Sequence, residues 1–158
     1  MVSVLFVCLA NTCRSPAAEG ILRHMADKAG VDLHVESCGI GDWNLGQLPN
    51  PRMRDAAKNR GVCLSSRAQK FIPEFFDTFD FILVVDTKVM NELYCHAKEP
   101  GHKAKIHLIT HFSEAYRDEA IPDPYYGGEA GFETVLDMLE DSCTGIVHHI
   151  KPENRPLA

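Results

Sequence analysis

A cysteine and an arginine near the start of the chain have the spacing of a nucleophile and its anion clamp. Cys8 is followed six positions later by Arg14 and then at once by Ser15, and none of the other five cysteines has an arginine at that offset. A thiolate is a strong nucleophile, and a guanidinium presents paired donors that match two oxygens of a tetrahedral anion. The pair predicts a site where the Cys8 sulfur attacks phosphorus while Arg14 binds the phosphoryl oxygens.

The residues around this pair predict a strand, a tight loop and a helix. The run Val2–Cys8 is almost wholly apolar, which is typical of a strand covered on both faces. Ser15 is a favoured N-cap and Pro16 a favoured first helical residue, and apolar residues recur at helical spacing until Gly30. We therefore expect a strand that ends at Cys8 and a helix that begins near Ser15, joined by a loop.

This loop is expected to form an anion-binding nest. Backbone N–H groups at a strand–loop–helix junction converge on one point, where the helix N-terminus adds positive potential. We expect Ser15 to hydrogen-bond the Cys8 sulfur and Asn11 to hold the loop in shape through bonds to its backbone. The predicted binding residues of the loop are Leu9, Ala10, Asn11, Thr12, Cys13 and Ser15.

Further along the chain, apolar runs alternate with helical patterns. We expect strands near residues 33–37, 79–85 and 105–110, and helices over 52–60, 88–96 and about 132–150. Stretches rich in Gly, Pro and Asn or Asp predict loops at 39–51 and 121–128. This alternation favours an α/β fold with a parallel sheet between helix layers, which binds ligands at the carboxyl ends of its strands. Cys8, Asp86 and the loop after Thr110 would meet at that edge.

Composition restricts the class of protein. With 158 residues, we expect one domain over residues 1–150 and a frayed C-terminal tail over 151–158. The net charge of −6 argues against nucleic acid or an anionic membrane as a partner. The apolar N-terminal run is too short for a membrane span and has no basic residues before it, so we expect a cytoplasmic protein. The six cysteines include no C-x-x-C pair, and we expect no metal and no other cofactor.

The segment VLFVCLANTCRSPAAE closely resembles the active-site segment of low-molecular-weight protein tyrosine phosphatases. The resemblance continues in the same order at SCGIGDW, FDFILVVD and DPYYGGEAGFETV, so it covers nearly the whole chain. It implies a three-layer α/β/α fold of the flavodoxin-like (Rossmann-like) phosphatase I type, with four parallel strands in the order 2-1-3-4. It also implies hydrolysis of phosphotyrosine in proteins, and of small aryl phosphates, through a cysteinyl-phosphate intermediate without metal. We expect a monomer whose partners are phosphotyrosine proteins and, in the active site, inorganic phosphate and other oxyanions.

The resemblance also implies roles for residues outside the loop. Asp123, between two prolines, matches the general acid that protonates the leaving phenolate and later the base that activates water. Cys13, five residues after Cys8, matches a second loop cysteine that traps the oxidised nucleophile as a reversible disulfide. A deep aromatic slot that accepts a phenyl ring is predicted from Trp43, Tyr125 and Tyr126.

Three residues depart from the family's pattern. Ala10 stands where a glycine is usual, and we expect a cost of about 1 kcal/mol if that position needs a positive φ. Ser66 and Gln69 replace a histidine and an arginine that relatives often carry, so the interactions that support the loop must differ. Asp86, at the end of a strand, either anchors the loop by accepting hydrogen bonds or caps the next helix.

Two other functions are compatible with the anion loop. A thiol-dependent arsenate reductase has the same fold, but its relay needs a cysteine just beyond the third strand, where this chain has Asp86. A non-catalytic phosphotyrosine-binding module is expected to have lost the nucleophile or the acid, and both Cys8 and Asp123 are present. Catalysis on an aryl phosphate is therefore the favoured prediction.

Overall fold

The computed structural model describes residues 1–124 and 128–151 of the chain. Its centre is a sheet in which strand β1 (Val2–Cys8) lies between β2 (Leu33–Gly39) and β3 (Phe81–Val84), with β4 (Ile106–Leu108) beside β3. All neighbouring strands are parallel, and the pairing of β1 with β2 ends where Cys8 is opposite Gly39. The order β2-β1-β3-β4 confirms the predicted sheet.

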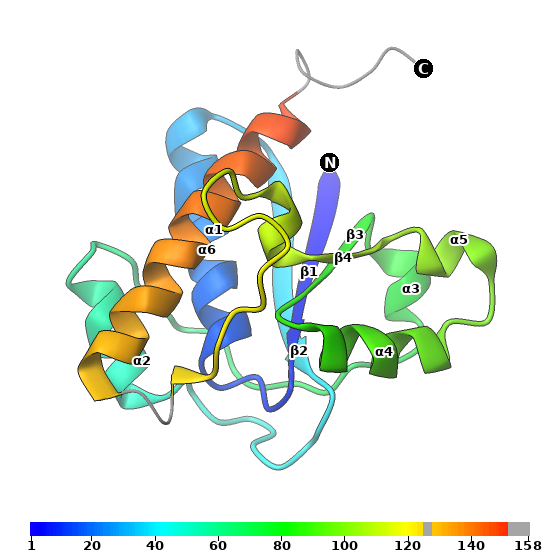
Figure 1. The fold of residues 1–158 in the computed structure, drawn as a ribbon, viewed down its shortest axis with the longest axis horizontal. Coiled ribbons are helices and arrows are strands. Elements are labelled where there is room, and N and C mark those ends of the chain that lie inside the picture. Colours follow the sequence, from blue (N-terminus) through cyan, green and yellow to red (C-terminus); the bar gives the residue numbers. More distant parts are fainter. Residues whose placement is uncertain (125–127, 152–158) are drawn as a thin grey trace.

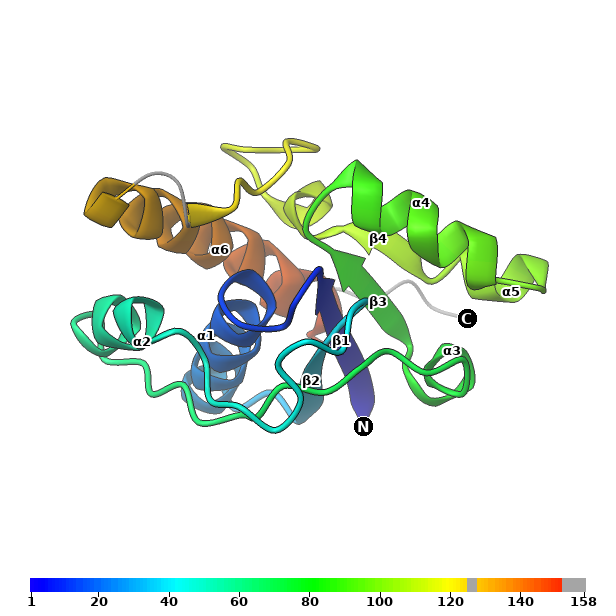
Figure 2. The same cartoon turned by 90° about the horizontal axis from the view of Figure 1, so that it is seen from below.

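Helices cover both faces of the sheet (Figures 1 and 2). One face carries α1 (Arg14–Ala29), α2 (Pro51–Lys58) and the long α6 (Gly128–Ile150), with α1 and α6 in direct contact. The other face carries α3 (Phe75–Thr78), α4 (Thr87–His96) and α5 (Pro100–Lys103). A 3-10 turn, η1 (Ile109–Phe112), follows β4 and contacts α6. The two helix layers confirm the predicted three-layer α/β/α fold.

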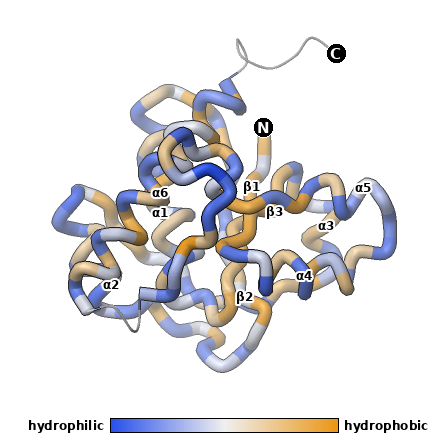
Figure 3. The backbone as a smooth tube through the Cα atoms, viewed as in Figure 1, coloured by the Kyte–Doolittle hydropathy of each residue, from blue (hydrophilic) through white to orange (hydrophobic). Residues whose placement is uncertain are grey.

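The apolar run that opens the chain becomes the most deeply buried strand. Val4, Leu5, Phe6 and Val7 are each 0 % exposed, because helices cover both faces of β1. A central parallel strand therefore needs no alternation of apolar and polar residues. Figure 3 shows the strands as the apolar centre of the molecule, with hydrophilic residues on the outer helices and loops.

Parallel pairing collects the carboxyl ends of the strands at one edge of the sheet. The loop after β1 (residues 9–13), the loop after β2 (residues 40–50) and Asp86 after β3 all lie at that edge (Figure 2). The fold thus brings together segments that are far apart in the sequence, as the α/β pattern predicted.

Helix α1 begins two residues before the predicted first helical residue, Pro16. Its first residue is Arg14, and Cys13 in the N-cap position makes no side-chain capping bond. Ser15 lies inside the first turn, where its Oγ is 2.8 Å from Cys8 Sγ. The predicted Ser15 cap is therefore wrong, because the hydroxyl contacts the sulfur instead. The helix ends as predicted at Gly30, whose φ of 67° is left-handed.

Several other boundaries differ from the predicted ones. The third strand is confined to β3, and the predicted fourth strand is split between β4 and η1. The four-residue helices α3 and α5 were not predicted, since one helical turn is too short to show an apolar period. Of the predicted tail, only Lys151 is described, and its N–H donates to the Val147 carbonyl at 3.0 Å. Residues 152–158 lie outside the described residues.

Candidate active site

Cys8 ends β1 with its sulfur turned towards the loop that follows. The backbone N–H of Asn11 donates to Cys8 Sγ at 3.2 Å, and Ser15 Oγ lies 2.8 Å from the same sulfur. Cys8 is 3 % exposed. Hydrogen-bond donors directed at a cysteine sulfur at the start of a helix are typical of reactive cysteines. The structure thus brings Cys8, Asn11 and Ser15 into one cluster.

Asn11 shapes the loop with both its backbone and its side chain. Its φ of 57° is left-handed, a conformation that Asn adopts more readily than most residues. Its Oδ1 accepts from the backbone N–H of Gln69 at 3.0 Å, so its Nδ2 must be the donor to Ser15 Oγ at 2.7 Å and Ser37 Oγ at 3.0 Å. Ser15 Oγ accepts from Asn11, so its own proton has two acceptors within reach, Cys8 Sγ at 2.8 Å and the Cys38 carbonyl at 3.4 Å.

A buried carboxylate continues this network and was not among the predicted site residues. Ser37 Oγ donates to Glu19 Oε1 at 2.6 Å, and Arg23 Nη2 donates to Glu19 Oε2 at 2.8 Å. Glu19 is 4 % exposed, so the neighbouring guanidinium balances its charge inside the protein. The signal in the sequence is the four-residue spacing of Ser15, Glu19 and Arg23, which puts the three on one face of a helix.

The Arg14 guanidinium is buried and held by two acceptors. Its Nη1 donates to Asp86 Oδ2 at 3.2 Å and to the Ile121 carbonyl at 2.9 Å. Asp86 Oδ1 also accepts from the backbone N–H of Val89 at 2.9 Å and so caps α4. Both of the roles considered for Asp86 are therefore present in one side chain. An arginine fixed through one nitrogen keeps its other N–H groups in a defined direction for an anion.

Asp123 follows the segment that the guanidinium holds. The N–H of Ile121 donates to the Val85 carbonyl at 2.9 Å, which ties this segment to the end of β3. Asp123 is exposed, and its charge reaches the anion loop. Burial, the Asp123 carboxylate and the Cys8 sulfur together raise the pKa of Cys13 to about 11. Asp123 and the loop therefore lie at the same edge of the sheet.

The aromatic slot predicted from Trp43, Tyr125 and Tyr126 is described only in part. Trp43 is 67 % exposed in the loop after β2, and its ring lies so close to Gly41 that a Cβ there would not fit. Leu9 in the anion loop is also exposed, and its carbonyl accepts from the Gly41 N–H at 2.9 Å. Tyr125 and Tyr126 lie outside the described residues.

Ala10 does not take the conformation that would make it costly. Of the described residues other than glycine, only Asn11 and Asp118 have a positive φ, so the cost considered for Ala10 does not arise. The close approach that favours a glycine beside the loop is on β2. A Cβ on Gly39 would lie 3.0 Å from backbone atoms of Leu9, Ala10 and Asn11, tighter than ordinary packing allows.

Gln69 supports the loop by a route of its own. Besides the bond from its N–H to Asn11, its Nε2 donates to Glu36 Oε1 at 3.1 Å and to the Ser37 carbonyl at 3.0 Å. The loop is also bonded through Thr12, whose carbonyl accepts from the Asn50 N–H at 2.8 Å. The two bonds from Gln69 Nε2 are consistent with the expectation that Gln69 supports the loop through other contacts than an arginine would make.

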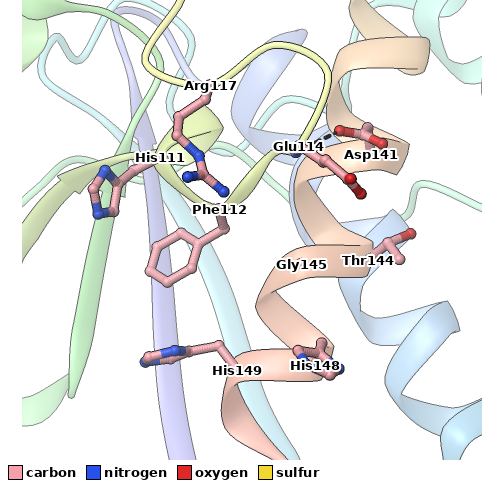
Figure 4. A pocket seen from close by; sticks show the side chains of 9 residues that line it. All are labelled: His111, Phe112, Glu114, Arg117, Asp141, Thr144, Gly145, His148 and His149. Atoms are coloured by element: carbon pink, nitrogen blue, oxygen red, sulfur yellow. Dashed lines mark hydrogen bonds between the residues drawn. The ribbon is translucent and has the colours of Figure 1, made fainter.

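A cavity lies between η1 and the C-terminal half of α6 (Figure 4). Its volume is about 830 Å³, and the side chains around it include His111, Phe112, Arg117 and His149. None of the predicted site residues that the structure describes lines it. Asp141 at its margin accepts from the backbone N–H groups of the turn that follows η1.

Residues 1–124 and 128–151 contain neither a candidate metal site nor a candidate membrane span. No group of three or more His, Cys, Asp or Glu side chains in this part of the chain has the arrangement of a metal site. No helix within it is long and apolar enough to cross a membrane. All six cysteines are free thiols, and Cys8, Cys13, Cys38 and Cys143 are buried.

Comparison with known proteins identifies the family. The family described as low molecular weight phosphotyrosine protein phosphatase matches residues 3–155. A putative low molecular weight protein-tyrosine-phosphatase of Synechocystis is 39 % identical over 152 residues, which is 95 % of this chain and 97 % of that protein.

Solved structures agree with the sequence match. The protein tyrosine phosphatase of Entamoeba histolytica, crystallised with Hepes in its active site, has a TM-score of 0.92 and 32 % identity, covering 98 % of this chain and 100 % of that one. DARP, a Drosophila arginine phosphatase, has a TM-score of 0.87 and 34 % identity, covering 95 % and 98 %.

The geometry predicts that Asn11→Ala weakens binding of inorganic phosphate. Alanine costs about 1–2 kcal/mol in the left-handed conformation and leaves the Gln69 N–H and Ser15 without their partner. We expect the dissociation constant for phosphate, measured by calorimetry, to rise about tenfold or more, since tenfold is about 1.4 kcal/mol. Ser37→Ala is the matched control, because it cuts the same network but leaves the loop backbone intact, and it should have a smaller effect. An unchanged constant in Asn11→Ala would contradict the role given to this residue.

Proposed function

The chain belongs to the low molecular weight phosphotyrosine protein phosphatase family, and from this premise we propose that it hydrolyses phosphotyrosine in proteins through a phosphocysteine at Cys8. One observation carries the proposal: the buried Cys8 sulfur meets the Asn11 N–H and Ser15 Oγ, while the Arg14 guanidinium is fixed at the start of the same helix. A nucleophile, an anion cradle and an anion clamp thus converge on one point.

In the first step the Cys8 thiolate attacks phosphorus in line with the tyrosyl oxygen. The S–P bond forms as the P–O bond to the ring breaks, and Asp123 gives its proton to the departing phenolate. The N–H groups of residues 9–15 and the free face of the Arg14 guanidinium stabilise the equatorial oxygens, where negative charge is spread.

In the second step water attacks the phosphocysteine. The Asp123 carboxylate takes a proton from the water as the new P–O bond forms, the S–P bond breaks, and inorganic phosphate leaves. The Ser15 hydroxyl, 2.8 Å from Cys8 Sγ, stabilises the sulfur as a leaving group. Every proton in the cycle is thereby accounted for by Asp123 and water.

The position of Asp123 supports its role as acid and base. The bond from Arg14 Nη1 to the Ile121 carbonyl holds the segment before Asp123 beside the anion loop. An exposed acid at the mouth of a buried anion site can meet the oxygen that joins the phosphate to a ring. Leu9, Trp43, Tyr125 and Tyr126 would contact that ring, and this aromatic slot would select phosphotyrosine over the shorter phosphoserine.

The wider properties of the enzyme follow from the same reasoning. We infer a monomer that acts in the cytoplasm as one catalytic domain over residues 1–150, with neither nucleic acid nor membrane as a partner. The net charge of −6 supports the exclusion of these anionic surfaces. Arg14 and the backbone donors supply the positive charge that the chemistry needs, so the mechanism uses no metal or other cofactor.

The competing functions fit these contacts less well. A thiol relay for arsenate reduction would need a cysteine at the end of β3, and Asp86 at that place holds Arg14 and caps α4. A module that only binds phosphotyrosine would not need a cysteine sulfur in hydrogen-bond contact with the Asn11 N–H and Ser15 Oγ, nor an acid such as Asp123 near it. Hydrolysis is the function that uses all of these groups.

The central prediction is metal-independent hydrolysis that depends on Cys8. We expect the protein to hydrolyse p-nitrophenyl phosphate in the presence of a metal chelator, because the mechanism uses no metal. Vanadate should inhibit this hydrolysis, because vanadate and the phosphate group of the substrate compete for the anion loop. Cys8→Ser should abolish turnover yet still bind phosphate, because only the nucleophile is lost. A panel of phosphotyrosine, phosphoserine and phosphoarginine peptides, run beside an arsenate-reduction assay, tests the substrate class. Full activity in Cys8→Ser, or turnover of arsenate alone, would refute the mechanism.

The acid role predicts a dependence on the leaving group. Asp123→Ala should slow aryl phosphates with basic leaving groups by about 100-fold or more, because a general acid typically contributes 10²–10⁴-fold. Aryl phosphates whose phenolates leave without a proton should lose much less. Asp27→Ala is a suitable control, since Asp27 is exposed near the C-terminal end of α1, whereas the anion loop lies at the N-terminal end of that helix. Equal losses for good and poor leaving groups would remove Asp123 from this role.

Cys13 is proposed to protect the oxidised nucleophile. Peroxide converts the Cys8 thiolate to a sulfenic acid, the Cys13 thiolate attacks that sulfur, and water leaves as the disulfide forms; a dithiol restores both thiols. Because the pKa of Cys13 is raised to about 11, the reactive thiolate becomes more abundant as pH rises towards that value. The disulfide should form about tenfold faster per pH unit between pH 7 and 9 after a peroxide pulse. Mass spectrometry of quenched samples measures this, with Cys13→Ser as control, and a pH-independent rate would contradict it.

A further inference from the structure

The segment between β4 and Asp123 is long and has little regular structure. After η1, residues 113–122 form neither a helix nor a strand. Figure 1 shows this segment in yellow, passing from the end of β4 towards the start of α6. Such a loop samples many conformations unless contacts fix it. A general acid at its end must be held within hydrogen-bond reach of the leaving oxygen, so the contacts that fix the loop bear on catalysis.

The first part of this segment is bonded to α6. The Ser113 hydroxyl donates to Asp141 Oδ2 at 2.5 Å. The same oxygen accepts from the backbone N–H groups of Glu114 and Ala115 at 2.9 and 3.0 Å. Ser113 is 0 % exposed, so this contact is closed to solvent. These bonds fix where the chain leaves η1, but they do not reach the residues next to Asp123.

The last part of the segment is bonded to Thr110, the second residue of η1. Thr110 Oγ1 donates to the Glu119 carbonyl at 2.5 Å, and the Thr110 carbonyl accepts from the Asp118 N–H at 3.3 Å. Asp118 has a φ of 61°, and this left-handed residue turns the chain back towards Thr110. Thr110 is 1 % exposed, so water does not compete for its hydroxyl.

Thr110 and Val85 together fix the residues just before Asp123. Strands β3 and β4 are neighbours in the sheet, and Val85 and Thr110 follow their carboxyl ends. The Val85 carbonyl accepts from the Ile121 N–H at 2.9 Å, while the Thr110 hydroxyl binds the Glu119 carbonyl. The chain is therefore held at two nearby points, which set the direction in which it continues to Asp123.

We infer that Thr110 is a positioning residue for the general acid, because its hydroxyl holds, through the Glu119 carbonyl, the segment that directs Asp123 at the leaving oxygen. The inference rests on the proposed function. The guanidinium that binds phosphate should stay in place, because it contacts the Ile121 carbonyl, and the Ile121 N–H keeps its own bond to the end of β3. Loss of the Thr110 hydroxyl should therefore impair proton transfer and leave phosphate binding intact.

The test is the dependence of kcat/KM on the leaving group in Thr110→Val, which replaces the hydroxyl with a methyl group of similar size. For phenyl phosphate, whose phenolate needs a proton, kcat/KM should fall about tenfold, because a small misplacement of a catalytic group can cost about 100-fold. For dinitrophenyl phosphate, whose phenolate leaves without a proton, it should fall less than about twofold. The Kd for inorganic phosphate should stay unchanged. Thr110→Ser keeps the hydroxyl and should restore the rate with phenyl phosphate.

Two further variants separate positioning from a general loss of stability. In an Asp123→Ala background, Thr110→Val should cause no further loss with phenyl phosphate, because no acid is left to position. Thr78→Val is the matched control, since Thr78 Oγ1 donates to the Glu74 carbonyl at 3.0 Å in α3, on the other face of the sheet. This variant should leave kcat/KM for both substrates unchanged.

The possible results distinguish this inference from the proposed function. An equal change for the two substrates in Thr110→Val, no change included, or an additive loss in the double variant, would overturn the inference alone. If valine disrupts folding, which loss of phosphate binding reveals, Thr110→Ala removes the hydroxyl without the added methyl group and carries the same expectations. Loss of phosphate binding in both variants would also overturn the inference. If Asp123→Ala itself shows no dependence on the leaving group, the acid role in the proposed function fails, and this inference fails with it.

Discussion

The left-handed turn at Asn11 is the constraint on which the rest of the site depends. With φ at 57°, the Asn11 N–H reaches Cys8 Sγ while the side chain points into the protein rather than out of the loop. The Gln69 N–H then fixes which end of the amide is the acceptor. That single assignment sets the direction of the bonds to Ser15 and Ser37, because a backbone N–H can only donate.

The network around Asn11 ends at the Cys8 sulfur on one side and at the Glu19 carboxylate on the other. On one side the donors run from Asn11 through Ser15 to the Cys8 sulfur, and on the other from Asn11 through Ser37 to the Glu19 carboxylate. The Asn11 side chain must therefore donate two hydrogen bonds, to Ser15 and Ser37, and accept one from the Gln69 N–H. Only a neutral amide can do both. An aspartate of the same shape could not, so the amide is required by the polarity of the network as well as by the backbone.

The parts of this site that the sequence predicts are those with a local pattern. The apolar run of β1, the stop at Gly30 and the six-residue offset of Cys8 and Arg14 can each be recognised without knowing what lies elsewhere in the chain. The parts that it does not predict depend on contacts between distant segments. Glu19 resembles any helical glutamate until Ser37 is placed beside it by the pairing of β1 with β2.

The same limit explains the two corrections within the loop. Ser15 has the residue type and position of an N-cap, and only the nearness of Cys8 Sγ shows that its hydroxyl is used elsewhere. The resemblance to the family draws attention to Ala10, where a glycine is usual, whereas the left-handed residue is its neighbour Asn11. The crowding that does demand glycine is at Gly39, which faces the loop from another strand.

This acidic chain can bind a phosphate because the anion is bound by local hydrogen-bond donors and not by the net charge of the protein. Asp86 occupies one nitrogen of Arg14 and offsets part of its charge, so the guanidinium alone cannot neutralise a dianion. The remainder must come from backbone N–H dipoles that β1 and α1 hold in place before the anion arrives. Those dipoles act over a few ångströms, and the acidic surface acts over about a Debye length of 8–10 Å. The loop can therefore bind a phosphate although the chain as a whole is acidic.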